Sequence, residues 1–364
     1  MLSDTNVVID LDALKHNAAV VGRCAPNSRI MAVIKADAYG HGMVMVAKAL
    51  SNVDGYAVAQ LNEALTLRKA GIKKTILVLT GFGCSDDISV FSKNNLDAVV
   101  HSDYQLDLLA CVSPQQPLSV WLKINTGMNR LGVEPLCVTR INNALALSAD
   151  VRQPIKLMTH LACADDMTST ATQEQIAVFD ESIDGMTGEQ SICNSAGLLG
   201  WKYAQRDWVR PGLMLYGASP FFDRKASDDD LKPVMTFNSR VIALRSVKKS
   251  EKVGYGGCWV AEKTSLIATV GAGYGDGYPR HAVTGTPVLI GGQRVPLVGR
   301  VSMDSINVDA SQCKNIKVGD TVTLWGEGLP IDEVAQMSET ISYELMCGIT
   351  GRVSRVVKGA INGE

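Results

Sequence analysis

The stretch AVIKADAYGHG, residues 32–42, places a lysine between an apolar run and a turn rich in small residues. The run 30–34 predicts a buried strand, and the apolar pattern stops at Lys35. Burial of an ammonium group is costly unless the group is paired or loses its charge. A lysine at a strand end usually reaches into water. Lys35 therefore becomes a site candidate only if other polar residues gather at the same place.

The chain around this stretch alternates short β-type runs with helical patterns. Predicted strands cover residues 29–34, 55–58, 75–79, 97–100, 118–124, 155–160, 190–193 and 207–209. Helical patterns cover residues 41–51, 60–70, 103–112, 134–148 and 170–184. Strands that alternate with helices in this way predict an α/β fold, a (β/α)8 TIM-type barrel rather than an open sheet.

The pattern changes after the polar stretch SPFFDRKASDDDLKP, residues 219–233. Four β-rich segments follow, at 234–247, 265–272, 286–298 and 318–325, and helical patterns occur only near 331–338 and 341–348. Gly-Gly and Gly-Asp turns separate the β-rich segments. We therefore expect two domains, a barrel at 1–225 and a mainly β domain at 226–364.

Composition excludes several classes of protein. The chain has 364 residues and a net charge of −2 without a basic block, so nothing favours nucleic acid or an anionic membrane as a partner. The first residues lack the pattern of a secretion signal, and no apolar run reaches membrane-spanning length. The nine cysteines are scattered and never form Cys-x-x-Cys. This pattern predicts reduced thiols in the cytoplasm, with neither a metal site nor a disulfide framework.

Polar residues recur where the predicted barrel strands end, which is where barrel enzymes carry their chemistry. These residues are Lys35, Lys123, His160, Asn194, Ser195 and Arg210, which Pro211 and Gly212 follow. No paired carboxylates favour glycoside hydrolysis, and no histidine or cysteine motif favours a metal. A strand-end lysine beside small residues and helix starts suits a Schiff base with pyridoxal phosphate. The run GAGYGDG, residues 271–277, lacks dinucleotide-binding spacing and is interpreted as a turn or gating loop.

The same residues resemble a known family. AVIKADAYGHG resembles the pyridoxal phosphate attachment signature of alanine racemases. The similarity continues in family order through KINTGMNRLG (123–132), MTHLACADD (158–166), CNSAG (193–197), DWVRPGLMLYG (207–217), VGYGG (253–257), GYGDGYPR (273–280), VGRVSMD (298–304) and ISYELMC (341–347). Members of this family pair a barrel with a β domain and act as head-to-tail homodimers.

The resemblance implies a two-base interconversion of L-alanine and D-alanine on a pyridoxal phosphate aldimine. Lys35 would form the internal aldimine and remove the α-proton from D-alanine. Tyr255, from the β domain of the other subunit, would remove it from L-alanine. A phenol is a weak base at neutral pH, and His160 with Arg210 would assist it.

The resemblance also implies the residues that bind cofactor and substrate. Arg210 would face the pyridine nitrogen, and the remaining cofactor contacts would come from Tyr39, His160, Asn194, Ser195, Gly212, Leu213 and Tyr343. Arg130 would bind the substrate carboxylate, with Met303 and Asp304 supplied by the other subunit. Lys123 would carry a carbamate that clamps Arg130, as in many family members. The corridor for substrate access would involve Tyr274, Asp165, Arg280, Arg300 and Ile341.

Two alternatives remain open from the sequence. One is another pyridoxal phosphate enzyme of this fold, either a broad-specificity racemase or an amino-acid decarboxylase, although the Gly-Gly-Gly phosphate loop of those decarboxylases is absent. The other is a non-catalytic cofactor-binding protein, which typically resembles the barrel alone. The sequence leaves open a biosynthetic or catabolic role for D-alanine, the tolerance for serine and the strength of the dimer.

Overall fold

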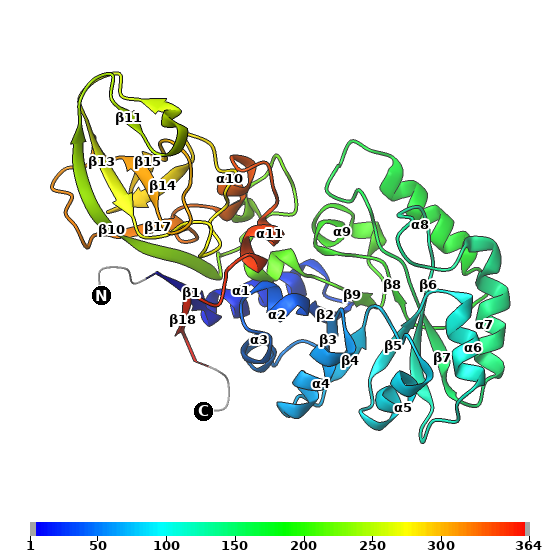
Figure 1. Cartoon of the computed structure of the whole chain (residues 1–364). Coiled ribbons are helices and arrows are strands. Elements are labelled where there is room, and N and C mark those ends of the chain that lie inside the picture. The colour runs from blue at the N-terminus through cyan, green and yellow to red at the C-terminus, as the bar shows by residue number, and fades with distance from the viewer. Residues whose placement is uncertain (1–4, 361–364) are drawn as a thin grey trace.

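A closed barrel of eight parallel strands forms the first part of the chain in the computed structural model, which describes residues 5–360 (Figure 1). The strands are β2 (Arg29–Val33), β3 (Gly55–Val58), β4 (Thr75–Val78), β5 (Asp97–Val100), β6 (Leu118–Lys123), β7 (Val151–Met158), β8 (Gln190–Ser191) and β9 (Trp208–Val209). Each strand pairs with the next, and β9 pairs with β2 to close the ring. Every predicted barrel strand is present, so the predicted (β/α)8 barrel is confirmed.

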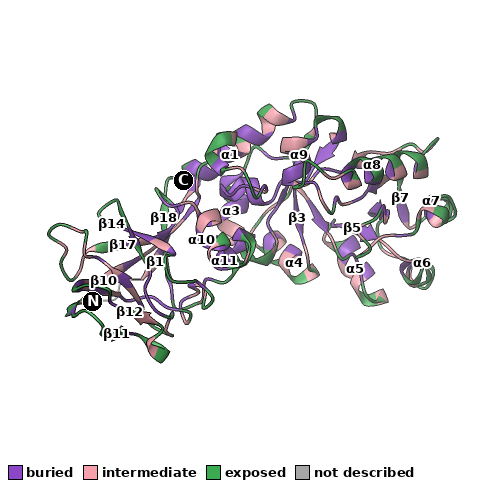
Figure 2. Cartoon of the chain, turned by 90° about the horizontal axis from the view of Figure 1, so that it is seen from above, coloured by how far each residue is buried: buried purple, intermediate pink, exposed green. Residues whose placement is uncertain are grey.

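Helices surround the barrel and cover its strands. They are α1 (Leu11–Cys24), α3 (Met43–Ala49), α4 (Leu61–Lys69), α5 (Ser85–Lys93), α6 (Asp103–Ala110), α7 (Val138–Leu147), α8 (Ala171–Ser182) and α9 (Ser195–Gly200). The short 3-10 turns η1 (Pro135–Cys137), η2 (Lys202–Ala204), η3 (Leu213–Tyr216) and η4 (Ala226–Asp229) complete this part. Most residues of the barrel strands are buried and the outer helix faces are exposed in Figure 2, as expected for parallel strands covered on both sides.

The second part is mainly β, as predicted. Its sheet follows the order β15-β14-β17-β10-β1-β18, and β13 pairs with both β10 and β16. Its strands are β10 (Met235–Val247), β13 (Ser265–Val270), β14 (Pro287–Ile290), β15 (Gln293–Pro296), β16 (Ile306–Asp309) and β17 (Thr321–Trp325), with the hairpin β11 (Lys252–Val253) and β12 (Trp259–Val260). Two helices, α10 (Ile331–Gln336) and α11 (Ser342–Cys347), lie between this sheet and the barrel (Figure 1).

The two ends of the described chain meet in the second sheet. β1 (Asn6–Asp10) pairs antiparallel with β10 and parallel with β18 (Ser354–Lys358). The sequence predicted neither strand. The first described residues therefore belong to the sheet of the β domain, although they precede the barrel in the chain. The division at residue 225 stays a prediction, and its outer ends, 1–4 and 361–364, lie outside the described residues.

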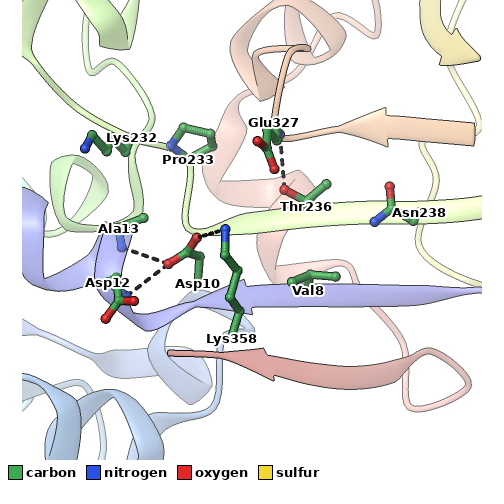
Figure 3. Close-up of a pocket in the computed structure, with 10 residues that line it drawn as sticks. All are labelled: Val8, Asp10, Asp12, Ala13, Lys232, Pro233, Thr236, Asn238, Glu327 and Lys358. Atoms are coloured by element: carbon green, nitrogen blue, oxygen red, sulfur yellow. Dashed lines mark hydrogen bonds and ion pairs between the residues drawn. The ribbon is translucent and has the colours of Figure 1, made fainter. Parts of the chain in front are cut away.

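Asp10 joins this sheet to the barrel. It caps α1 by accepting hydrogen bonds from the amides of Asp12, at 3.0 Å, and Ala13, at 2.9 Å, and it pairs with Lys358 at 2.8 Å (Figure 3). A cavity of about 470 Å³ lies here. Its lining contains none of the predicted site residues.

Across residues 5–360, no helix is long and apolar enough to cross a membrane.

Candidate active site

Lys35 lies at the start of an unusual turn directly after β2. It begins α2 (Lys35–Tyr39), in which Ala36, Asp37, Ala38 and Tyr39 all have φ of 53° or 54°. A left-handed conformation costs an L-residue roughly 1–2 kcal/mol. Four such residues in a row persist only where the surrounding structure enforces them, and backbone strain of this kind clusters at functional sites.

Carboxylates support this turn from both sides. Glu63 on α4 accepts a hydrogen bond from the amide of Ala36 at 2.7 Å and also binds the amides of Ala59 and Gln60. Asp37 accepts one from the amide of Met43 at 2.8 Å. Sequence reasoning missed Glu63, and the available signal was the Gln60-x-x-Glu63 pattern at a helix start.

A cluster of four cations, Lys35, Lys123, Arg130 and Arg210, gathers at the barrel mouth. Burial lowers the pKa of Lys35, and the charge of Arg130 lowers it further. Lys123 is buried at the end of β6, where burial, Arg210, Arg130 and Lys35 lower its pKa to about 8. Both amines therefore lose their protons more readily than ordinary lysines do. Among the described residues, no group of His, Cys, Asp or Glu side chains could hold a metal ion.

Arg210 is buried and holds His160 in one orientation. Its guanidinium donates to the Ser191 hydroxyl and the Thr159 carbonyl oxygen, each at 2.5 Å, and lies 3.3 Å from His160 Nδ1. Burial and the charge of Arg210 hold the pKa of His160 well below its usual range. Because a guanidinium only donates, His160 Nδ1 accepts and Nε2 carries the proton of the neutral ring.

Three residues, Tyr39, Ser195 and Gly212, form what we call the anion cradle. Ser195 is buried, and its Oγ accepts hydrogen bonds from the amides of Gly212 at 3.0 Å and Met214 at 3.3 Å. A hydroxyl that accepts in this way still has its own hydrogen to donate. A Cβ at Gly212 would lie 2.6 Å from the Tyr39 hydroxyl oxygen, so any larger residue at this position would displace the hydroxyl.

Tyr343, from α11, lies beside the anion cradle. Its ring centroid is 5.5 Å from that of Tyr39. Burial raises the pKa of Tyr343 to about 12 and also raises that of Tyr39, so both phenols keep their hydrogens at neutral pH. The cradle and Tyr343 thus offer hydroxyl donors to an anion without adding a charge, which fits a phosphate group.

A cavity of about 460 Å³ opens between the barrel and helices α10 and α11. Six predicted site residues line it: His160, Asp165, Asn194, Leu213, Ile341 and Tyr343. Asn194 is fixed there by its side-chain oxygen, which accepts a hydrogen bond from the Gly197 amide at 2.9 Å and caps α9.

Ile341 and Tyr343 are the predicted β-domain site residues that line this cavity, whereas the other six do not line it within one chain: Tyr255, Tyr274, Arg280, Arg300, Met303 and Asp304. Tyr255 lies in the 3-10 turn η5 (Tyr255–Gly257), between β11 and β12, and β11 is at the top of the β domain in Figure 1. Its side chain is 70% exposed, and Met303 and Tyr274 are also exposed. Arg280 and Arg300 are exposed as well, and Asp304 pairs with Arg352 at 2.8 Å. A single chain therefore presents Lys35 and Tyr255 in different places.

Two family models match nearly the whole chain. The model for the alanine racemase N-terminal domain matches residues 9–220, and that for the C-terminal domain matches residues 234–357. Among curated relatives, alanine racemase of Edwardsiella ictaluri is 47% identical over 349 residues, covering 95% of this chain and 96% of its own length. Alanine racemase of Shewanella piezotolerans is 46% identical over 346 residues, with 95% and 97% covered.

Solved structures agree with these relatives. The biosynthetic alanine racemase of Pseudomonas aeruginosa superposes with a TM-score of 0.95 at 41% identity, covering 98% of this chain and 99% of that one. Alanine racemase of Acinetobacter baumannii has a TM-score of 0.90 at 38% identity, covering 98% and 100%. Fold, sequence and the order of matched segments agree, and the chain belongs to the alanine racemase family.

Proposed function

We propose that this protein interconverts L-alanine and D-alanine with pyridoxal 5′-phosphate as cofactor and works as a head-to-tail homodimer. The observation that carries the proposal is the barrel mouth itself. There the half-buried Lys35, the buried Lys123, the Arg210–His160 contact and the anion cradle lie together on a chain 47% identical to a curated alanine racemase.

The residues present fit the cofactor. When bound, pyridoxal phosphate withdraws electrons from the α-carbon of an attached amino acid and so acidifies its α-proton. Tyr39, Ser195, Gly212, Leu213 and Tyr343 would hold the phosphate, with Asn194 beside them. Arg210 would face the ring nitrogen. A guanidinium stays protonated even though burial lowers the pKa of Arg210 to about 10, so it would keep that nitrogen unprotonated.

Lys35 would act as the base on one face of the substrate. Its lowered pKa favours the neutral amine, whose Nζ can accept the α-proton of D-alanine. Tyr255 of a second subunit would act on the opposite face and accept the α-proton of L-alanine. The Nε2 hydrogen of His160 would then donate to the phenol oxygen of Tyr255, which stabilises its deprotonated form.

The remaining residues would position the substrate. Arg130 would bind its carboxylate, and a carbamate on Lys123 would hold Arg130. Met303 and Asp304 would come from the second subunit, and Tyr274, Asp165, Arg280, Arg300 and Ile341 would line the access corridor. The exposure of Tyr255, Met303 and Tyr274 in one chain is consistent with residues that complete a partner's site.

The test measures both reaction and stereochemistry. Purified protein supplied with the cofactor is incubated with L-alanine or D-alanine in deuterium oxide and followed by circular dichroism and mass spectrometry. We expect racemisation in both directions and its loss in Lys35→Ala, while Lys48→Ala, which changes an exposed lysine on α3, stays active. Tyr255→Phe should lose deuterium exchange mainly with L-alanine. Equal loss with both enantiomers would contradict the two-base assignment.

Parallel incubations separate the alternatives. Racemisation of L-serine and L-lysine at rates similar to alanine would identify a broad-specificity racemase, and release of carbon dioxide would identify a decarboxylase. Cofactor binding without any turnover would favour the non-catalytic protein.

We also propose the cytoplasm as its location, since all nine cysteines are free thiols. Growth of a deletion strain that requires D-alanine would assign the biosynthetic rather than the catabolic role.

A further inference from the structure

His41 follows the left-handed turn that carries Lys35 and is completely buried. Its Nδ1 lies 2.9 Å from the carbonyl oxygen of Ala38 and 2.9 Å from that of Tyr39. Carbonyl oxygens only accept hydrogen bonds, so Nδ1 carries the ring hydrogen and donates it to both. One side chain thus binds the last two carbonyls of the strained turn.

The other ring nitrogen of His41, Nε2, is buried and makes no hydrogen bond to any residue that the structure describes. A proton there would be an unpaired buried donor, so the ring is neutral with an unprotonated Nε2. Burial lowers the pKa of His41 to about 4, which agrees with this assignment. A buried polar atom without a partner costs roughly 1–3 kcal/mol, and the contacts of Nδ1 and of the ring must offset that cost.

The ring of His41 also belongs to an aromatic stack. It stacks on Tyr216 with centroids 4.5 Å apart and planes at 29°. Tyr216 in turn contacts Tyr39, with centroids 4.8 Å apart, and donates a hydrogen bond to the carbonyl oxygen of Val33 on β2 at 3.0 Å. The stack therefore joins the strand before Lys35 to the turn after it.

These contacts converge on the hydroxyl of Tyr39. The backbone of Tyr39 is left-handed and held by His41, its ring is held by Tyr216, and its hydroxyl lies against Gly212 in the anion cradle. A relaxed turn would rotate the Tyr39 side chain away from the cradle. We propose that His41 is a positioning residue that, by binding the Ala38 and Tyr39 carbonyls, aims the Tyr39 hydroxyl at the cofactor's phosphate. This inference rests on the proposed pyridoxal phosphate cofactor.

The test compares the cofactor with pyridoxal, the same compound without its phosphate. The purified dimer is loaded with either compound, and the dissociation constants are measured by equilibrium dialysis. In His41→Phe, which keeps a ring but has no donor, binding of pyridoxal phosphate should weaken about tenfold while pyridoxal changes less than about twofold. His41→Asn, which keeps a donor near the Nδ1 position, should recover most of the loss.

A second measurement separates positioning from general stability. If His41 acts through the Tyr39 hydroxyl, His41→Phe should add less than about twofold to the loss of affinity already caused by Tyr39→Phe. Equal weakening for both compounds in His41→Phe, no weakening, or full additivity with Tyr39→Phe would overturn the inference. Wild-type protein that binds neither compound would instead overturn the proposed cofactor, and the inference with it.

A measurement on the unaltered protein tests the inference even if His41→Phe does not fold. The chain has five histidines, so nitrogen-15 labelling of histidine gives few ring signals to assign. We expect one neutral ring with the hydrogen on Nδ1, and its signal should be missing in folded His41→Asn. A neutral His41 ring with its hydrogen on Nε2 would have no donor for the two carbonyls, and this result would remove the proposed positioning.

Discussion

Lys123 should react with dissolved carbon dioxide and carry a carbamate at neutral pH. Only an uncharged amine attacks carbon dioxide, and the buried position of Lys123 among Arg210, Arg130 and Lys35 lowers its pKa to about 8. At pH 7 about one Lys123 in ten is then uncharged, against roughly three in ten thousand for an ordinary lysine. This difference of about 300-fold separates Lys123 from exposed lysines. The carbamate is an anion, so the same cations that disfavour the ammonium group stabilise the product.

The pH dependence follows from the same pKa. At a fixed total bicarbonate concentration, dissolved carbon dioxide falls about tenfold per pH unit near neutrality, while the uncharged amine rises about tenfold below its pKa. Carbamate formation also releases a proton, so a rise of one pH unit increases the ratio of carbamate to uncharged amine about tenfold at a given concentration of carbon dioxide. This increase cancels the fall in dissolved carbon dioxide. The ratio of carbamate to free lysine should therefore rise with pH up to about 8 and then level off.

The assay is carbon-13 NMR of the cofactor-loaded protein in labelled bicarbonate across this pH range. Lys123→Ala should lack the carbamate signal. Lys156→Gln is the matched control, because Lys156 also lies on a barrel strand but is paired with Asp97 at 2.9 Å, and its signal should persist. A wild-type protein without a carbamate signal, or a signal that keeps rising to pH 10, would refute the reasoning.

Three further predictions concern the site and its assembly. Gly212→Ala should weaken pyridoxal phosphate binding about tenfold, because the added Cβ displaces the Tyr39 hydroxyl. Gly22→Ala is the control and should leave binding unchanged in the same cofactor titration, because the space around a Cβ at Gly22 is open. Glu63→Ala removes the acceptor of three amides and should lower the free energy of unfolding by about 2 kcal/mol, measured with urea; an unchanged midpoint would argue against its support of the turn. A mixture of Lys35→Ala and Tyr255→Phe, unfolded and refolded together, should regain roughly a quarter of wild-type racemisation, since about half of the dimers are mixed and each has one intact site. No gain, despite mass-spectrometric proof of mixed dimers, would contradict a shared site.

The sequence by itself determined the barrel, the mainly β second part and the family. Barrel strands such as β3 and β5 are short apolar runs buried on both faces, and this pattern is visible in consecutive residues. The sequence also identified Lys35, Lys123 and Arg210 as site candidates, because a polar residue directly after an apolar run is a local signal. Their roles came from resemblance to the family rather than from the pattern.

Only the tertiary structure decided which distant residues meet. β1 pairs with β10 and β18, which lie more than two hundred residues away, and no local pattern records a partner at that separation. The left-handed turn after Lys35 depends on Glu63 and His41, because isolated L-residues favour the right-handed form. The lowered pKa of Lys123 likewise arises from burial beside Arg210 and Arg130, which other strands supply. Periodicity reports the environment of one segment, whereas strain, desolvation and charge repulsion exist only once separate segments are packed together.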